Sequence, residues 1–189
     1  VDPDKVFLMG YSHGGYGAFA IGQVMPDRFA AVHASAAAPT PGEGAARNLR
    51  NTVFTHMVGE EDTAYGRAER NQAFAEEIEA LQAANPGAYP VSFEWQPGYG
   101  HGGLPDRDKI QTMYPAVREA APRELDWVIT GGGVRDHFWL RVGEPAEGAE
   151  LTASLRDNLL RISGAGVDEV ELRLAARLVD EPRLTPAHA

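Results

Sequence analysis

The sequence contains no cysteine, which excludes disulfide bonds and thiolate metal ligands. This absence leaves the redox compartment open, because secreted proteins can also lack disulfides. No apolar run approaches the roughly 20 residues that a membrane-spanning helix needs. Positive charge is scarce as well: 17 Lys and Arg stand against 27 Asp and Glu, a formal net charge of −10. We therefore expect no membrane span and no nucleic-acid partner.

Motifs for metals, nucleotides and cofactors are also missing. The sequence has no H-E-x-x-H pattern, and no histidine has a partner at metal-ligand spacing. Its glycine-rich segments match neither the G-x-x-x-x-G-K-[ST] pattern nor the spaced G-x-G-x-x-G pattern of nucleotide-binding loops. His33 and His56 fall inside predicted strands, which favours positions in the core or on a sheet face. We expect no metal and no cofactor.

The chain has enough apolar material for one core, since 43% of its 189 residues are hydrophobic. Residues 1–121 alternate short apolar runs with helix-like segments, which is typical of a parallel sheet covered by helices. In the first predicted helix Gly14, Ala18 and Gly22 recur every four residues, a small-residue stripe that would allow close packing. Strands are predicted at 6–9, 30–35, 53–58 and 91–95, and helices at 13–25, 64–84 and 108–120.

From residue 121 the pattern changes to short strand-like runs separated by turns. Strands without intervening helices favour antiparallel pairing. Trp127 and Trp139 in this region could form a glycan-stacking platform, but packing is the favoured interpretation. We therefore expect an α/β part at 1–121, a small antiparallel β module at 122–181 and a tail at 182–189. The strand-like runs lie at 125–129, 138–142, 151–155, 159–162 and 170–174.

The strongest functional signal lies at residues 10–15, which read Gly-Tyr-Ser-His-Gly-Gly and join the first predicted strand to the first predicted helix. A G-x-S-x-G pattern in that place is typical of a nucleophile elbow, a tight turn that exposes a serine above the end of the strand. Such a turn predicts glycine at positions 10 and 14, because side chains there would collide with the backbone. Ser12 is the candidate nucleophile. The alternative is a glycine-rich turn with an idle serine.

A serine nucleophile needs a base, and the base needs a carboxylate to orient it. Asp62 and His101 each follow a predicted strand and are therefore expected at the carboxyl ends of strands, where catalytic groups gather in α/β sheets. Glu60 and Glu61 compete with Asp62, which could instead cap the helix that follows it. The alternative for His101 is an exposed loop histidine.

Three further residues complete the predicted site. The backbone N–H of His13, directly after the serine, would donate to an oxyanion. Tyr11 and Tyr99 flank the proposed nucleophile and base. Either tyrosine could bind substrate or simply pack.

The residues around the serine resemble the elbow region of α/β-hydrolase esterases and prolyl-oligopeptidase-like enzymes. In those enzymes an Asp-Pro-Asp-(Arg/Lys)-hydrophobic segment leads into Gly-Tyr-Ser-x-Gly-Gly-Tyr-Gly. Residues 2–6 of this chain read Asp-Pro-Asp-Lys-Val, and residues 10–17 read Gly-Tyr-Ser-His-Gly-Gly-Tyr-Gly. The resemblance implies the α/β-hydrolase fold for residues 1–120.

Two later loops carry the same resemblance. Residues 59–65 look like the acid loop of the family, which singles out Asp62, and residues 100–102 look like its histidine loop. The order Ser, Asp, His is also that of the family. The β module is similar to the C-terminal all-β extension of some bacterial members of the poly(3-hydroxybutyrate) depolymerase and phospholipase/carboxylesterase-like groups.

The family fold has about four more strands before the elbow strand, and one of the loops there supplies the second oxyanion donor. The resemblance therefore implies a truncated α/β-hydrolase sheet, with the N-terminal half of its own domain expected as a missing partner. It implies a serine hydrolase that cuts carboxylic esters through an acyl-enzyme, with a small-molecule ester or peptide as substrate. One alternative is a serine peptidase of the prolyl-oligopeptidase type. Another is a non-catalytic truncated hydrolase whose β module binds a partner or a glycan.

Overall fold

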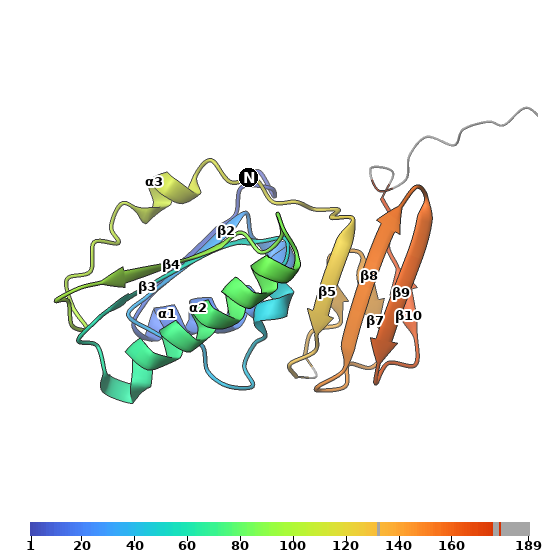
Figure 1. The fold of residues 1–189 in the computed structure, drawn as a ribbon. Coiled ribbons are helices and arrows are strands. Elements are labelled where there is room, and N and C mark those ends of the chain that lie inside the picture. Colours follow the sequence, from blue (N-terminus) through green and yellow to red (C-terminus); the bar gives the residue numbers. More distant parts are fainter. Residues whose placement is uncertain (132, 176–177, 179–189) are drawn as a thin grey trace, which may run out of the picture.

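A four-stranded parallel sheet forms the centre of the α/β part in the computed structural model, which describes residues 1–131, 133–175 and 178. Neighbouring strands follow the chain order β1-β2-β3-β4, and Ser35 of β2 pairs with Tyr11 of β1 and with Met57 of β3. Helices α1 and α2 cover one face of the sheet, and α3 lies over the other (Figure 1). The elements are β1 (Phe7–Tyr11), α1 (His13–Val24), β2 (Ala31–Ser35), β3 (Val53–Gly59), α2 (Arg67–Ala84), β4 (Val91–Gln96) and α3 (Lys109–Met113).

Helix α1 packs closely on the sheet because its inner face carries small residues. A methyl group on Gly22 would lie 3.0 Å from side-chain atoms of Val32 and Phe54, and one on Gly15 would lie 2.5 Å from the Ser35 carbonyl oxygen. The stripe is Gly15, Ala18 and Gly22, all buried, whereas Gly14 is exposed. The expected stripe was therefore wrong by one residue at its first position, because the helix begins at His13 and turns position 14 outward.

Aromatic rings join α1, α2 and the sheet into the main core. Phe19 of α1 lies 5.3 Å from Phe54 of β3 and 5.7 Å from Phe74 of α2, measured between ring centroids. Burying three such rings against one another stabilises the fold by several kcal/mol, at about 2 kcal/mol for each side chain. The two helices are thereby held against the same face of the sheet (Figure 1).

Two helix predictions differ from the structure. The segment expected to be helical at 108–120 has only one short helix, α3, because Pro115 has no N–H to donate and its ring would clash with the preceding turn. The helix expected at 64–84 begins at Arg67. Tyr65 and Gly66 before it have φ values of 58° and 66°, a left-handed conformation that cannot continue an α-helix.

The strands after residue 121 pair antiparallel in two three-stranded sheets, ordered β5-β8-β9 and β10-β7-β6. Trp127 and Trp139 are 2% exposed within a core shared by both sheets, which confirms packing and excludes a surface platform built on these two rings. The tail expected at 182–189 lies outside the described residues. The strands are β5 (Glu124–Val128), β6 (Asp136–His137), β7 (Leu140–Val142), β8 (Glu150–Arg156), β9 (Leu159–Ala165) and β10 (Val170–Leu172).

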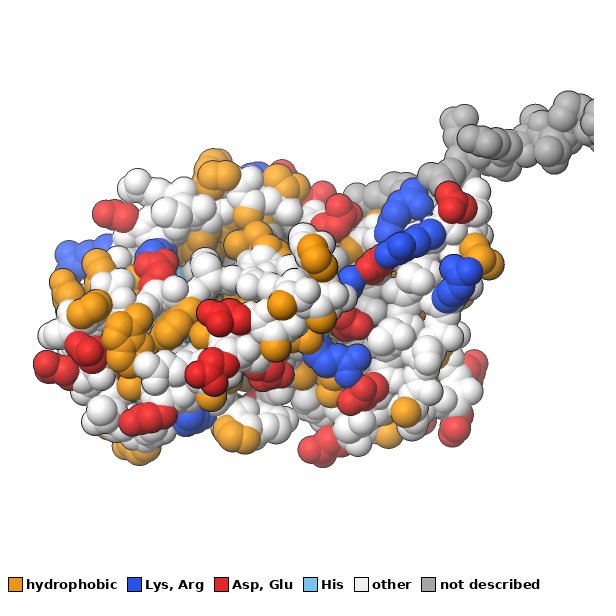
Figure 2. Space-filling model, viewed as in Figure 1, with side chains coloured by type: hydrophobic (Ala, Val, Ile, Leu, Met, Phe, Trp, Pro, Cys, Tyr) orange, Lys and Arg blue, Asp and Glu red, His pale blue; other side chains and the backbone are white. Residues whose placement is uncertain are grey.

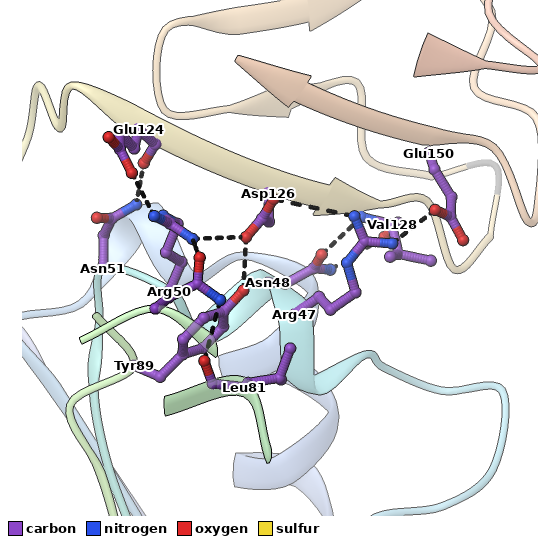
Figure 3. A network of polar contacts seen from close by, with 11 residues as sticks. Arg47, Asn48, Arg50, Asn51, Leu81, Tyr89, Glu124, Asp126, Val128 and Glu150 are labelled. Atoms are coloured by element: carbon purple, nitrogen blue, oxygen red, sulfur yellow. Dashed lines mark hydrogen bonds and ion pairs between the residues drawn. The ribbon is translucent and has the colours of Figure 1, made fainter. Parts of the chain in front are cut away.

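A short 3-10 helix, η2 (Ala46–Leu49), joins the β strands to the α/β part (Figure 3). Asn48 is buried there, and its side-chain amide donates to the Val128 carbonyl at 3.0 Å and accepts the Val128 N–H at 2.7 Å. The Asn48 amide thus makes the two backbone hydrogen bonds with Val128 that a neighbouring strand would otherwise make.

Charged groups extend this junction on both sides of Asn48 (Figure 3). Arg50 forms ion pairs with Asp126, at 3.0 Å, and with Glu124. Tyr89 donates a hydrogen bond from its hydroxyl to the same Asp126 carboxylate. Hydrogen bonds and ion pairs therefore connect β5 to the α/β part along its length.

Acidic side chains outnumber basic ones in the sequence, and both kinds are visible on the surface (Figure 2). Acidic side chains are scattered over the face seen in Figure 2, while several basic ones gather over the β strands at its right. Across the described residues, no helix is both long enough and apolar enough to cross a membrane.

Candidate active site

Ser12 occupies the turn between β1 and α1 with φ 55° and ψ −118°, a conformation that non-glycine residues rarely adopt. Its backbone N–H donates to the Ser35 carbonyl at 2.9 Å, and its carbonyl accepts the Tyr16 N–H at 3.0 Å. Hydrogen bonds to the neighbouring strand and to the first turn of the helix therefore fix the conformation of this turn. Backbone strain of this kind costs about 1–3 kcal/mol and clusters at functional sites.

The glycines on either side of the serine have different roles. A methyl group on Gly10 would lie 1.9 Å from the Gly14 carbonyl oxygen, a backbone collision that the turn cannot relieve. A methyl group on Gly14 would meet nothing within 4 Å. The expectation that both positions require glycine is right for Gly10 and wrong for Gly14, because only the strand side of the turn faces the helix backbone.

A chain of hydrogen bonds links Ser12 to His101 and His101 to Asp62. The Ser12 Oγ lies 2.9 Å from His101 Nε2, and His101 Nδ1 lies 2.9 Å from Asp62 Oδ2. The three residues follow β1, β3 and β4, and parallel strands bring their carboxyl ends to one edge of the sheet. The fold thus brings together the three residues that the sequence nominates as nucleophile, base and acid.

Asp62 is 2% exposed and is held by Arg67, which sequence reasoning did not single out. Arg67 Nε donates to Asp62 Oδ2 at 2.8 Å, and its terminal nitrogen donates to Asp62 Oδ1. Burial raises the pKa of Asp62, but the hydrogen bonds from Arg67 and His101 outweigh it and hold the pKa below the usual value. Asp62 is therefore an anion at neutral pH, turned toward the imidazole.

The competing carboxylates have other contacts. Glu60 accepts a hydrogen bond from the Gly98 N–H at 3.0 Å, which ties the loop of His101 to the end of β3. Glu61 is exposed, and its backbone N–H donates to the Tyr99 carbonyl at 2.9 Å. The Asp62 side chain makes no helix cap and instead contacts Arg67 and His101.

The loop of His101 is fixed by close backbone contacts. A methyl group on Gly59 would lie 2.2 Å from the Tyr99 carbonyl oxygen, so only glycine fits at this crossing. Tyr11 donates a hydrogen bond from its hydroxyl to the His101 carbonyl. Burial, followed by the charges of Asp106 and Asp62, raises the pKa of Tyr11, so this donor stays protonated. Tyr11 therefore holds the histidine loop from the elbow.

Of the two remaining predicted site residues, His13 lines the cavity beside Ser12 and Tyr99 does not. His13 is the first residue of α1 and lines the cavity beside Ser12, so its N–H has no partner within the helix. The Tyr99 side chain is partly exposed and is not part of the wall of that cavity.

A cavity of about 640 Å³ opens beside Ser12 and His101. Its walls also come from Thr40 in the loop before η2, from Tyr65 just before α2, and from Arg70 in the first turn of α2. These residues were missed because nothing in their local sequence marks them. Only the spacing of Arg67 and Arg70, three apart on one helix, could have shown that both project to the same side.

His33 and His56 belong to the core. His33 lies between the hydroxyls of Thr55 and Ser35, at 2.6 and 2.7 Å, and His56 contacts Asn71 at 2.7 Å. Burial lowers the pKa of each to about 4. This confirms the prediction of core positions for both. Within the described ranges, no group of His, Asp and Glu side chains is arranged to hold a metal ion.

No protein-family model matches the chain, and no curated protein sequence matches it. A crystal structure of esterase PE8 is similar, with a TM-score of 0.46 and 17% sequence identity over 61% of this chain. This chain spans 51% of that esterase chain, about half its length. The structure itself shows a mixed α/β fold with a four-stranded parallel sheet and small antiparallel sheets.

Proposed function

We propose that the protein is a serine hydrolase that cleaves carboxylic esters through an acyl-enzyme intermediate. The observation that carries the proposal is the hydrogen-bonded chain from Ser12 through His101 to Asp62, with 2.9 Å at each step. A hydroxyl nucleophile is activated when it is hydrogen-bonded to an imidazole that is in turn hydrogen-bonded to a buried carboxylate. Here the hydroxyl belongs to a serine in a strained conformation at the start of a helix.

In the first step the Ser12 oxygen attacks the ester carbonyl while His101 Nε2 takes its proton. His101 then gives that proton to the departing alcohol, which leaves an acyl group on Ser12. Asp62 keeps the proton of His101 on Nδ1 and stabilises the imidazolium. Water, activated by His101 in the same way, attacks the acyl group and releases the acid and the free serine.

The negative charge that develops on the carbonyl oxygen is stabilised by the N-terminus of α1. The free N–H of His13 is a donor there, and the helix dipole favours negative charge at the same point. One such donor contributes about 3 kcal/mol to transition-state stabilisation.

Ester hydrolysis is the less demanding of the two reactions open to this set of residues. An alkoxide leaves more readily than an amide nitrogen, so any pair of hydroxyl and imidazole that cleaves peptides also cleaves esters. A peptidase activity would add amide cleavage to the same chemistry, and a p-nitroanilide substrate would detect it.

A fluorophosphonate probe and p-nitrophenyl butyrate test the proposal. The protein should become labelled and should hydrolyse the ester, and Ser12→Ala should abolish labelling and lower kcat by about a thousandfold or more. Ser92→Ala removes an exposed serine of β4 and serves as the matched control, with both readouts unchanged. Equal labelling of the Ser12→Ala protein would refute the assignment of the nucleophile. No labelling and no hydrolysis by the unaltered protein would favour a non-catalytic role.

A further inference from the structure

We propose that the substrate of this site carries a free carboxylate and that Arg70 binds it in the cavity beside Ser12. The inference rests on the proposed function, because it names the class of ester that the same site accepts. It comes from the one arginine of the cavity wall that has no acidic partner among the residues the structure describes.

The start of α2 carries three polar side chains near the site, and two of them, Arg67 and Arg70, line the cavity. Arg70 and Asn71 follow Arg67 by three and four residues, so both lie on the side of the helix that Arg67 faces. Arg67 is occupied by Asp62, and Asn71 contacts His56 and the Ala37 carbonyl. Arg70 therefore remains as the cation of this face that the protein has not neutralised.

Arg70 is held in place by neutral groups. Its two terminal nitrogens donate to the carbonyls of Tyr65, at 3.2 Å, and Pro39. Its Nε is buried and has no hydrogen-bond partner in the described part of the chain. A guanidinium has five N–H donors, so these contacts leave donors for a ligand while they fix the direction of the side chain.

Tyr16 contacts both Ser12 and Arg70 and so relates the position of the arginine to that of the serine. Tyr16 lies one helical turn after Ser12, and the Arg70 guanidinium lies 5.9 Å from the centre of its ring. Ser12, Tyr16 and Arg70 all line the same cavity of about 640 Å³. That volume is within the usual range for small-molecule sites, so one substrate can reach both the serine and the guanidinium.

A carboxylate matches the charge and the planar shape of this cation. Arginine is charged at every physiological pH, and its planar fork matches the two oxygens of a carboxylate. Glu43 is the opposing charge in the cavity wall, but it is exposed and forms no ion pair with Arg70. Removal of Glu43 should therefore strengthen the binding of an anionic substrate.

Matched esters test the inference. The ratio of kcat/KM for p-nitrophenyl hydrogen adipate to that for its neutral methyl ester probes a carboxylate on the acyl side, and p-acetoxybenzoate against its methyl ester probes the alcohol side. Arg70→Gln should lower the ratio about tenfold or more for at least one pair, the effect of one charged hydrogen bond. Arg70→Lys keeps the charge without the fork and should retain part of the ratio, whereas Glu43→Gln should raise it.

Arg161→Gln is the control for a change of net charge. Arg161 is exposed on β9, outside the cavity, and its removal should leave both ratios unchanged. Ratios that are the same in the Arg70→Gln and the unaltered protein for both pairs would overturn the inference.

A binding measurement separates this inference from the proposed function. Calorimetric titration of the Ser12→Ala protein with monomethyl adipate needs no turnover, and adding Arg70→Gln should weaken binding about tenfold. Arg70-dependent binding in a protein that neither labels nor hydrolyses esters would support the carboxylate site and refute the hydrolase. Labelling and hydrolysis without any effect of Arg70 would refute the carboxylate site alone.

Discussion

Arg67 and Asp62 form the buried ion pair on which the orientation of His101 depends. Both side chains are almost fully buried, and the pair is closed by two hydrogen bonds from one guanidinium. Removing one partner of such a pair leaves an uncompensated charge in the interior, which costs about 3–5 kcal/mol. The same arginine orients the Asp62 oxygen that accepts a hydrogen bond from His101. Arg67 therefore contributes both to the stability of the fold and to the orientation of His101.

Arg67→Met should lower the free energy of unfolding by about 3 kcal/mol and slow fluorophosphonate labelling of Ser12, because it leaves the Asp62 carboxylate buried without its cation. Urea denaturation and labelling rates measure the two effects. The double variant Arg67→Met with Asp62→Asn removes both charges and should recover most of the stability without recovering the labelling rate. A double variant as unstable as the single one would contradict the role of the buried charge.

At the scale of elements, the elbow joins a strand and a helix at their closest approach. β1 ends at Tyr11, α1 begins at His13, and Ser12 is the single residue between them. Gly10 and Gly15 lie where the two backbones meet, whereas Gly14 faces open space. The glycine pattern of the motif therefore mixes positions that the turn requires with one that it does not.

Gly10→Ala should destabilise the protein by about 3 kcal/mol or more, because its methyl group would overlap the Gly14 carbonyl and force the backbone to move. Gly14→Ala is the matched change within the same motif. It should leave the free energy of unfolding within about 1 kcal/mol of the original value, since alanine favours helices. Thermal unfolding of the two variants measures the difference, and equal losses would show that the turn is not as tight as the structure has it.

At the scale of the whole molecule, three buried histidines make the fold sensitive to acid. His33 and His56 lie in the sheet of the α/β part, and His137 stacks on Trp127 in the β strands. Burial lowers the pKa of His137 to about 3, and its Nδ1 has no hydrogen-bond partner among the described residues. All three histidines are neutral in the folded protein at pH values where an unfolded histidine is charged.

The free energy of unfolding should therefore fall as the pH is lowered from 7 toward 4. Over this interval the unfolded chain binds more protons than the folded one, and at pH 5 each buried histidine costs about 2 kcal/mol. The total loss, on the order of 5 kcal/mol, is a large part of the stability of a typical domain. His137→Phe should reduce the loss by about 2 kcal/mol, and the exposed His13→Gln should not. Urea denaturation at pH 7 and pH 5 measures these differences, and equal stability at the two values would refute the prediction.

The sequence alone predicted most of the elements and the three central residues of the candidate site. Hydrophobic periodicity and turn residues identified β1 to β4, β5 and β7 to β10, because apolar runs and glycine-rich turns are local signals. The short strand β6 (Asp136–His137) was not predicted, since it lies before the run expected at 138–142. The prediction of a helix at 108–120 was wrong because Pro115 lies inside the segment, and the helix ends at Met113 before it. The Ser12 motif and the strand ends before Asp62 and His101 were sufficient to nominate three residues that the fold then places within hydrogen-bond distance.

The local sequence determined which residues could take part in catalysis. A tight turn, the end of a strand and a histidine between glycines are each encoded by a few residues that are consecutive in the chain. Only the tertiary structure decided what surrounds them. Arg67 reaches Asp62, and Arg70 reaches the cavity beside Ser12, because α2 packs against β3 and β4. Asn48 reaches the Val128 backbone because β5 lies beside η2. These contacts join residues distant in the chain or on different elements, and their energies depend on burial and distance. Neither quantity exists until the chain is folded.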